Sequence, residues 1–334
     1  MDFLYRQFKA LGHDVVYLYN RLCFDVSNQV IKLAKFLESR KSKVETSLDI
    51  GLQYIQMTSE RFEIDADTLY EERAQQQTHL HGYPYYSILL EDWKREHELL
   101  DVFDPGFRSP RRIRLTVQEV STVLNDLGVI FDARRIDGNI YLDLTPEGLP
   151  MRKIIGVNEY SYNYLFIVLR ELFEYVKKGD EVYFVFDPDL SLDYELLKRV
   201  LKKYGCHVFN LTTSRISLGG KIQSARKGGW QGYTTKDILH RYTPRFSSNS
   251  IGLAIRHYLL AKNAVHKQFD FSYDEFEKSF EFAQAVEKKY GSLSFSELIE
   301  KVYSPNSDYS PPLTRSFNIW STKIEKNKSN ETKR

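Results

Sequence analysis

The sequence has few cysteines and no long apolar run. Only Cys23 and Cys206 occur among 334 residues, and neither belongs to a Cys-x-x-Cys pair. This excludes a disulfide framework and argues against a structural zinc site. No stretch reaches the roughly 18 apolar residues that a membrane span needs, and the first residues do not begin an apolar signal sequence. We therefore expect a cytoplasmic protein that holds no metal and contacts no membrane.

Net charge is also nearly absent, because 47 Lys and Arg residues stand against 45 Asp and Glu, a formal charge of +2. This balance leaves no global field that would draw the protein onto DNA, so any contact with RNA needs local basic patches. Aromatic residues, in contrast, are frequent, with 23 Tyr and 21 Phe. They suit either a surface that stacks on bases or an aromatic core, and we favour the core because such side chains bury a large area.

The most distinctive stretch is the basic glycine loop at residues 219–229, which reads Gly-Gly-Lys-Ile-Gln-Ser-Ala-Arg-Lys-Gly-Gly. It follows a strand-like run and precedes a helix expected to begin near Thr234. Glycines allow close approach of the backbone and cations neutralise charge, so the loop suits a polyphosphate or an RNA end. The alternative is a solvated basic turn. The candidate contacts are Lys221, Ser224, Arg226 and Lys227.

The order of helical and strand-like patterns indicates the α/β class. Residues 181–186 read as a buried strand, 190–204 as an amphipathic helix stopped by Gly205, and 206–209 as a second strand. Such a unit predicts parallel pairing with a right-handed crossover. Strands are also expected at 15–19 and, as a hairpin around Asp137-Gly138, at 129–132 and 139–144. Further helices are expected at 49–63, 65–79, 86–99, 116–127, 160–177, 249–262 and 273–290.

Several short motifs resemble, in the same order, the catalytic domain of class I aminoacyl-tRNA synthetases of the arginyl type. They are Leu11-Gly12-His13-Asp14-Val15-Val16, Asp25-Val26-Ser27-Asn28-Gln29, Gly51-Leu52-Gln53-Tyr54-Ile55, Leu127-Gly128-Val129-Ile130-Phe131-Asp132, Tyr141-Leu142-Asp143-Leu144 and Ser224-Ala225-Arg226-Lys227-Gly228. The last resembles the second signature loop of that family. Residues 251–260, followed by Phe269-Asp270-Phe271, resemble its stem-contact segment. The resemblance covers about residues 8–290.

The resemblance implies a Rossmann-like parallel sheet of the class I synthetase type, with a helical insertion and a C-terminal helical extension. We expect a catalytic domain at residues 1–248 with its insertion at about 28–100, a helical stem-contact segment at 249–303, and a loose polar tail at 304–334.

Two departures from the family concern its chemistry. No His-x-Gly-His precedes the first helix; His79-Leu80-His81-Gly82 stands elsewhere and is interpreted as a loop. The family's Tyr-x-x-Arg-Asp segment falls on residues 162–167, where the Arg-Asp pair is missing, and residues 221–224 lack the Lys-Met-Ser order. The two signature motifs share the neutralisation of ATP, and losing a few kcal/mol there slows activation by factors of hundreds. Complete ligase activity by this chain alone is therefore not expected.

The function that the resemblance then favours is tRNA-dependent peptide-bond formation from aminoacyl-tRNA, with arginyl-tRNA as the expected substrate. Cyclodipeptide synthases resemble class I catalytic domains in this way and work without the signature motifs. Such a transfer requires no cofactor, whereas retained ligase activity would use ATP. The alternatives are an ATP-dependent arginine–tRNA ligase completed by a partner chain, and a non-catalytic tRNA-binding paralogue.

Further candidate residues follow from position and from the resemblance. An amino-acid pocket is expected from Asp25, Gln29, Tyr162, Tyr164, Asp187 and Asp189, against the alternatives of helix caps, core aromatics and a turn. An RNA-backbone patch is expected from Arg108, Arg111, Arg112 and Arg114, against a solvated face. An acidic group at the strand ends that can pair with a guanidinium would support arginine as the substrate. The sequence identifies no catalytic nucleophile.

Overall fold

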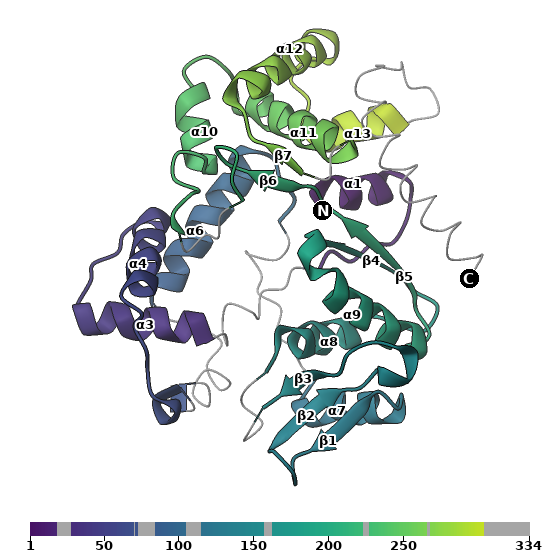
Figure 1. Cartoon of the computed structure of the whole chain (residues 1–334). Coiled ribbons are helices and arrows are strands. Elements are labelled where there is room, and N and C mark those ends of the chain that lie inside the picture. Colours follow the sequence, from purple (N-terminus) through teal and green to yellow (C-terminus); the bar gives the residue numbers. More distant parts are fainter. Residues whose placement is uncertain are drawn as a thin grey trace. The chain divides into compact units, whose positions relative to one another are not determined.

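The computed structural model describes residues 1–18, 28–69, 71–72, 84–104, 115–156, 162–222, 227–265 and 268–303. By its internal contacts the chain divides into two compact units. The first unit comprises Met1–Tyr17, Leu90–Arg108 and Thr212–Arg334, and the second comprises Leu18–Leu89 and Ser109–Leu211. Figure 1 shows the elements of both. The division expected from the sequence, into a catalytic domain, a stem-contact segment and a tail with boundaries at residues 248 and 303, is based on function. It stays a prediction.

The second unit contains a three-stranded antiparallel sheet. Strands β1 (Ile130–Ala133), β2 (Asn139–Leu142) and β3 (Arg152–Ile155) follow one another across it. Helices α7 (Val117–Asp126) and α8 (Tyr164–Tyr175) pack against this sheet. The hairpin predicted around Asp137-Gly138 is confirmed. The third strand was not predicted from the sequence.

The predicted strand–helix–strand unit is also confirmed. Strand β4 (Glu181–Phe186), helix α9 (Ser191–Tyr204) and strand β5 (His207–Thr212) follow in order, and β4 and β5 form one sheet. The Gly179 amide donates to the Gly205 carbonyl at 2.8 Å, and the His207 amide to the Asp180 carbonyl at 2.8 Å. These bonds advance in the same direction along both segments, as in a parallel pair. Gly205 ends α9 with φ of 107°, a conformation that favours glycine.

Two apolar clusters stabilise the second unit. The larger one joins the sheet to α7, α8, β4, α9 and β5, and its fully buried members include Val120, Leu142, Phe166, Leu197 and Val208. The smaller one joins α3 (Asn28–Arg40), α4 (Ser47–Ser59) and the first turn of α6 (Pro84–Leu99). There the Tyr85 hydroxyl donates to the Val30 carbonyl at 2.8 Å.

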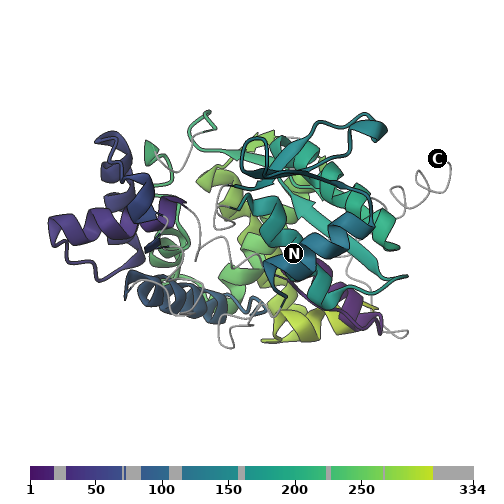
Figure 2. The same ribbon diagram turned by 90° about the horizontal axis from the view of Figure 1, so that it is seen from below.

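The first unit is mainly helical, with α1 (Asp2–Ala10), α10 (Thr235–Tyr242), α11 (Ser248–Val265), α12 (Tyr273–Tyr290) and α13 (Phe295–Tyr303). Helices α11 and α12 lie side by side (Figures 1 and 2). A short parallel sheet joins β6 (Arg215–Ser217) to β7 (Gln268–Asp270). Tyr242 is fully buried beside Phe276 and Phe280, with ring centroids 5.3 and 4.9 Å away. The aromatic residues here form a core, as we favoured.

The structure corrects part of the expected fold. Residues 15–18, expected to open a strand, lie in irregular chain. The protein is a mixed α/β structure with small sheets and mostly helices, and the largest sheet in its described part is antiparallel. Residues 66–69 and 71–72 are helical and residue 65 is not, while residues 70 and 73–79 of the expected helix and the tail at 304–334 lie outside the described residues. Among the helices described, none combines the length and apolar character needed to cross a membrane.

Candidate functional site

The basic glycine loop of residues 219–229 lies in the connection between β6 and α10, residues 218–234, and this connection begins with a tight two-residue turn. The Leu218 amide donates to the Lys221 carbonyl at 3.1 Å, and Gly219 and Gly220 both have positive φ, 60° and 76°. Two central residues with positive φ are typical of a type I′ turn, which glycine adopts without strain. The Gly220 amide donates to Asp270 Oδ1 at 2.9 Å. The start of the loop is thus anchored to the end of β7.

The end of the loop is anchored to α12 and α10. The Tyr273 hydroxyl donates to the Gly232 carbonyl at 2.5 Å, and the Tyr233 and Tyr273 rings stack with centroids 5.7 Å apart. The Arg241 guanidinium lies over the Tyr273 ring, 4.2 Å from its centre. Thr234 then caps α10 in a reciprocal capping box with Asp237, which confirms the helix start expected there.

Two of the four predicted phosphate contacts have a described position. Lys221 and Lys227 are exposed, and neither forms an ion pair with any residue that the structure describes. Ser224 and Arg226 lie outside the described residues. Because Asp270 accepts the Gly220 N–H, that amide is already engaged, and an anion at this turn would meet the lysine side chains.

In the second unit, Tyr164 and Asp193 come together near the end of β4. The Tyr164 hydroxyl donates to Asp193 Oδ2 in a short contact, and Arg152 Nε lies 3.3 Å from Asp193 Oδ1. Burial, followed by the hydrogen bond to Asp193, raises the pKa of Tyr164, so its hydroxyl stays protonated. Sequence reasoning missed Asp193. Its place in the first turn of the helix after a buried strand was the available signal.

The other predicted pocket residues have local contacts. Asp187 Oδ1 accepts the Asp189 amide at 2.9 Å and caps the 3₁₀ turn Pro188–Leu190, and Tyr162 stacks on Phe166 at 5.5 Å. These contacts match the cap and core alternatives, and the pocket roles stay predictions. Gln29 lies half-buried in the first turn of α3. Asp25, Arg108, Arg111, Arg112 and Arg114 lie outside the described residues.

The motif at residues 251–260 has a structural role in α11. Arg256 is largely buried and donates to the Leu100 and Asp101 carbonyls at 2.7 and 2.6 Å. It also pairs with Asp2 at 3.2 Å and lies over the Phe295 ring, 4.2 Å from its centre. A Cβ atom on Gly252 would lie 2.9 Å from the Leu100 carbonyl oxygen. Both residues therefore hold α11 against the segment that follows α6.

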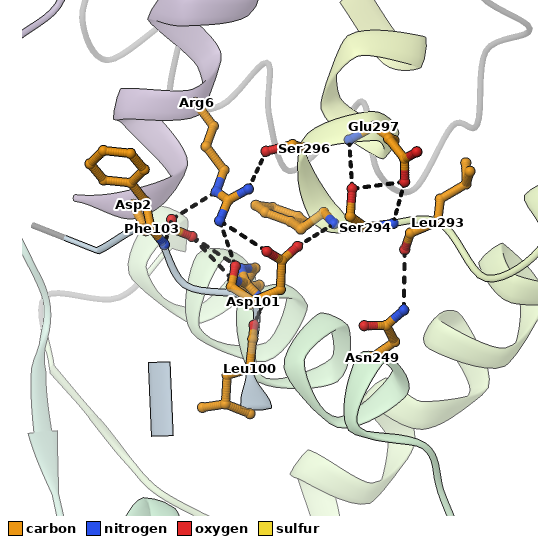
Figure 3. A network of polar contacts seen from close by, with 12 residues as sticks. Asp2, Arg6, Leu100, Asp101, Phe103, Asn249, Leu293, Ser294, Ser296 and Glu297 are labelled. Atoms are coloured by element: carbon orange, nitrogen blue, oxygen red, sulfur yellow. Dashed lines mark hydrogen bonds and ion pairs between the residues drawn. The ribbon is translucent and has the colours of Figure 1, made fainter. Parts of the chain in front are cut away.

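Asp2 and Arg6 of α1 complete this buried polar network, which Figure 3 shows. Arg6 Nε donates to Asp2 Oδ1 at 2.8 Å, and Arg6 Nη2 to the Asp101 carbonyl at 2.6 Å. Asp101 in turn accepts the Phe295 amide at 2.7 Å (Figure 3). Burial alone would raise the pKa of Asp2, but Arg256, Arg6 and the Phe103 amide together hold it below the ordinary value.

The depressed pKa of Asp2 predicts that the protein loses stability in acid. A carboxyl whose pKa is depressed by folding stabilises the protein above its unfolded pKa of about 3.8, and this contribution is lost as pH falls through the folded pKa. We expect the free energy of unfolding, measured in urea at a series of pH values, to fall in this range for the natural protein and much less for Asp2→Asn. The exposed Asp274→Asn variant should keep the natural pH dependence; a curve as flat as that of Asp2→Asn would contradict the assignment.

Comparisons with known proteins add a distant likeness to a solved structure. No family model and no curated protein matches the sequence. Among solved structures, a Campylobacter jejuni protein whose provisional assignment is arginyl-tRNA synthetase aligns over 98% of this chain and 86% of its own, at 12% identity and a TM-score of 0.36. A likeness of this size assigns neither a function nor a site residue to this chain.

Proposed function

We propose that the basic glycine loop binds the phosphate backbone at the 3′ end of tRNA, in a protein derived from class I aminoacyl-tRNA synthetases. The observation that carries this is a loop anchored at both ends that presents Lys221 and Lys227 to solvent without ion-pair partners in the described part of the chain. An anchored loop loses little conformational entropy on binding, and unpaired cations are free to meet phosphates. Its similarity to the second synthetase signature loop, at residues 224–228, supports the same ligand.

For the reaction we propose transfer of the aminoacyl group to form a peptide bond. The amine of one aminoacyl group attacks the ester carbonyl of another; the C–N bond forms, the ester C–O bond breaks, and the tRNA hydroxyl leaves with the proton. The step balances without ATP, metal or oxidant, since the aminoacyl ester is already activated. The missing Arg-Asp pair at residues 162–167 and the altered order at residues 221–224 favour this reaction over amino-acid activation.

The amino acid used is a separate proposal. Asp193 is an acidic group near the end of β4, and Arg152 of the chain itself already lies 3.3 Å from it. A substrate guanidinium would have to compete with that arginine. We therefore propose aminoacyl-tRNA as the substrate class, with arginyl-tRNA as the first member to test.

The loop assignment predicts weaker and less salt-sensitive tRNA binding after its lysines are neutralised. The double variant Lys221→Gln, Lys227→Gln should lower the affinity and reduce the slope of log K against log salt by roughly 1 for each phosphate that is no longer neutralised. Binding is measured by fluorescence anisotropy of labelled tRNA at several salt concentrations. The matched control is Lys41→Gln, Lys43→Gln, which removes the same charge from two exposed lysines of the second unit. Equal losses of affinity in the two double variants would refute a specific role for the loop.

The reaction is tested by incubating the protein with charged arginyl-tRNA, without ATP, and analysing the products by mass spectrometry. A dipeptide or cyclic dipeptide supports the proposal. Arginine-dependent pyrophosphate exchange would instead support the ligase. Salt-sensitive tRNA binding with neither activity would leave a non-catalytic paralogue, and absence of tRNA binding would refute the proposed function as a whole.

A further inference from the structure

The outer face of the β1–β2–β3 sheet carries an aromatic and basic row that the apolar core does not use. Phe131, Tyr141 and Lys153 are register partners across the three strands. In each of the three strands at least one residue next to this row belongs to the core cluster or packs against it: Ile130 in β1, Ile140 and Leu142 in β2, and Ile154 in β3. Successive side chains of a strand point to opposite faces, so the row points away from the core. Phe131 is 41% exposed and Lys153 is exposed.

The two rings are held by the hairpin and not by the core. Tyr141 is not among the partly buried side chains that pack against the large apolar cluster, and Phe131 is exposed; their ring centroids are 6.4 Å apart with planes tilted by 37°. The Tyr141 hydroxyl donates to Asp137 Oδ2 at 2.6 Å, which fixes the orientation of that ring. Successive stacked bases lie only about 3.4 Å apart, so rings at this spacing suit bases of an extended strand better than a duplex.

The charges around the row favour an anionic strand. Both carboxylates of the hairpin have partners, since Arg134 donates to Asp132 at 2.7 Å and Tyr141 to Asp137. The remaining cations, Arg135 and Lys153, are exposed and form no ion pair within the described part of the chain. Ile136, next to Arg135 in the turn, is 78% exposed.

The size of the face argues against a protein partner. Strands of four residues, at about 3.4 Å per residue and 4.8 Å between strands, span roughly 14 by 10 Å. A stable protein interface needs about 800 Å² from each partner, several times this area. Two or three nucleotides fit on it.

We propose that this outer face binds a nucleic-acid single strand, with bases stacking on Phe131 and Tyr141 and phosphates meeting Lys153 and Arg135. The surface belongs to the second unit and uses none of the residues of the basic glycine loop. Stacking on a ring is tolerant of base identity, so the surface supplies affinity and not sequence recognition.

The test is the anisotropy of a labelled single-stranded RNA of about eight nucleotides, and of its DNA counterpart, titrated with the full chain. The double variant Phe131→Leu, Tyr141→Leu keeps apolar side chains but removes both rings, and should weaken binding roughly five- to a hundredfold. Lys153→Gln should lower the salt slope by about 1. The matched control is Leu52→Ala, which trims an apolar side chain that is 42% exposed on α4 and should leave binding unchanged.

Thermal unfolding of each variant shows whether the sheet is still folded. Weaker binding by a folded ring variant, together with unchanged binding by the Leu52→Ala control, supports the proposal. It is overturned if neither oligonucleotide binds, if the ring variant binds as well as the natural protein, or if the face instead mediates self-association that the ring variant abolishes. In the Lys221→Gln, Lys227→Gln background the ring substitutions should weaken oligonucleotide binding by the same factor, which separates this surface from the proposed tRNA-end site.

Discussion

Replacement of Arg256 by alanine is expected to destabilise the first unit by about 3 kcal/mol, the lower end of the cost of removing one member of a buried, hydrogen-bonded ion-pair network. The Arg256 and Asp2 side chains are 11% and 15% exposed, so Asp2 would lose one of its two cationic partners where water scarcely reaches it, and only Arg6 would remain. The Leu100 carbonyl would also lose the guanidinium donor, and the Asp101 carbonyl would keep only Arg6. Arg256→Lys should recover part of the stability, because an ammonium keeps the charge but lacks the planar fork.

Urea unfolding followed by tryptophan fluorescence measures this loss of stability in the first unit. All three tryptophans, Trp93, Trp230 and Trp320, belong to the ranges of the first unit. The matched control is Arg245→Ala, whose guanidinium is 53% exposed and pairs with Glu277 at 2.8 Å; an exposed pair of this kind adds little stability. Equal shifts in the two variants would contradict the assignment. If Arg256 instead contacted RNA, Arg256→Ala would lose tRNA binding at unchanged stability.

Replacement of Gly252 by alanine is expected to destabilise the same unit by about 1 to 3 kcal/mol, as overpacking does in a close-packed interior. Alanine in a helix interior normally stabilises by up to about 1 kcal/mol relative to glycine. A destabilised Gly252→Ala variant would therefore have the opposite sign to that expected from helix propensity. Here the added Cβ would lie 2.9 Å from the Leu100 carbonyl oxygen and 3.0 Å from Arg256 Nη1. The carbonyl belongs to the backbone and cannot rotate away, so α11 would have to move.

The free energy of unfolding of Gly252→Ala, Arg256→Ala and the double variant tests this. Removing Arg256 clears one of the two close atoms, so the double variant should be destabilised by less than the sum of the two single effects. A stabilised Gly252→Ala variant would show that α11 and the segment after α6 do not pack closely. Strictly additive effects would show that the two residues act independently.

Local patterns predicted the elements that depend on neighbours in sequence. The apolar run at 181–186, the amphipathic helix stopped by Gly205 and the hairpin at Asp137-Gly138 all occur as expected. The start of α10 after Thr234 follows from a capping box within four residues, Thr234 to Asp237. Short apolar runs were less reliable: residues 15–18 have strand-like composition but no strand partner in the described structure, because strand pairing is a long-range property.

The candidate site was predicted only in part, for the same reason. The sequence pointed to Lys221 and Lys227, but the anchors of their loop, Asp270 and Tyr273, lie about fifty residues away and carry no local signal. Asp193 was missed because its partners Tyr164 and Arg152 come from other elements.

The sequence by itself determined the α/β class, the positions of the helices with clear caps and periodicity, and the cationic, glycine-rich character of the loop. Only the tertiary structure decided what the synthetase-like pattern at residues 251–260 does. Gly252 and Arg256 meet the Leu100 carbonyl and Asp2 through packing between segments more than 150 residues apart in the chain. The sequence shows the charge, size and spacing of the side chains. The role of a side chain such as Arg256 depends on which buried groups the fold places against it.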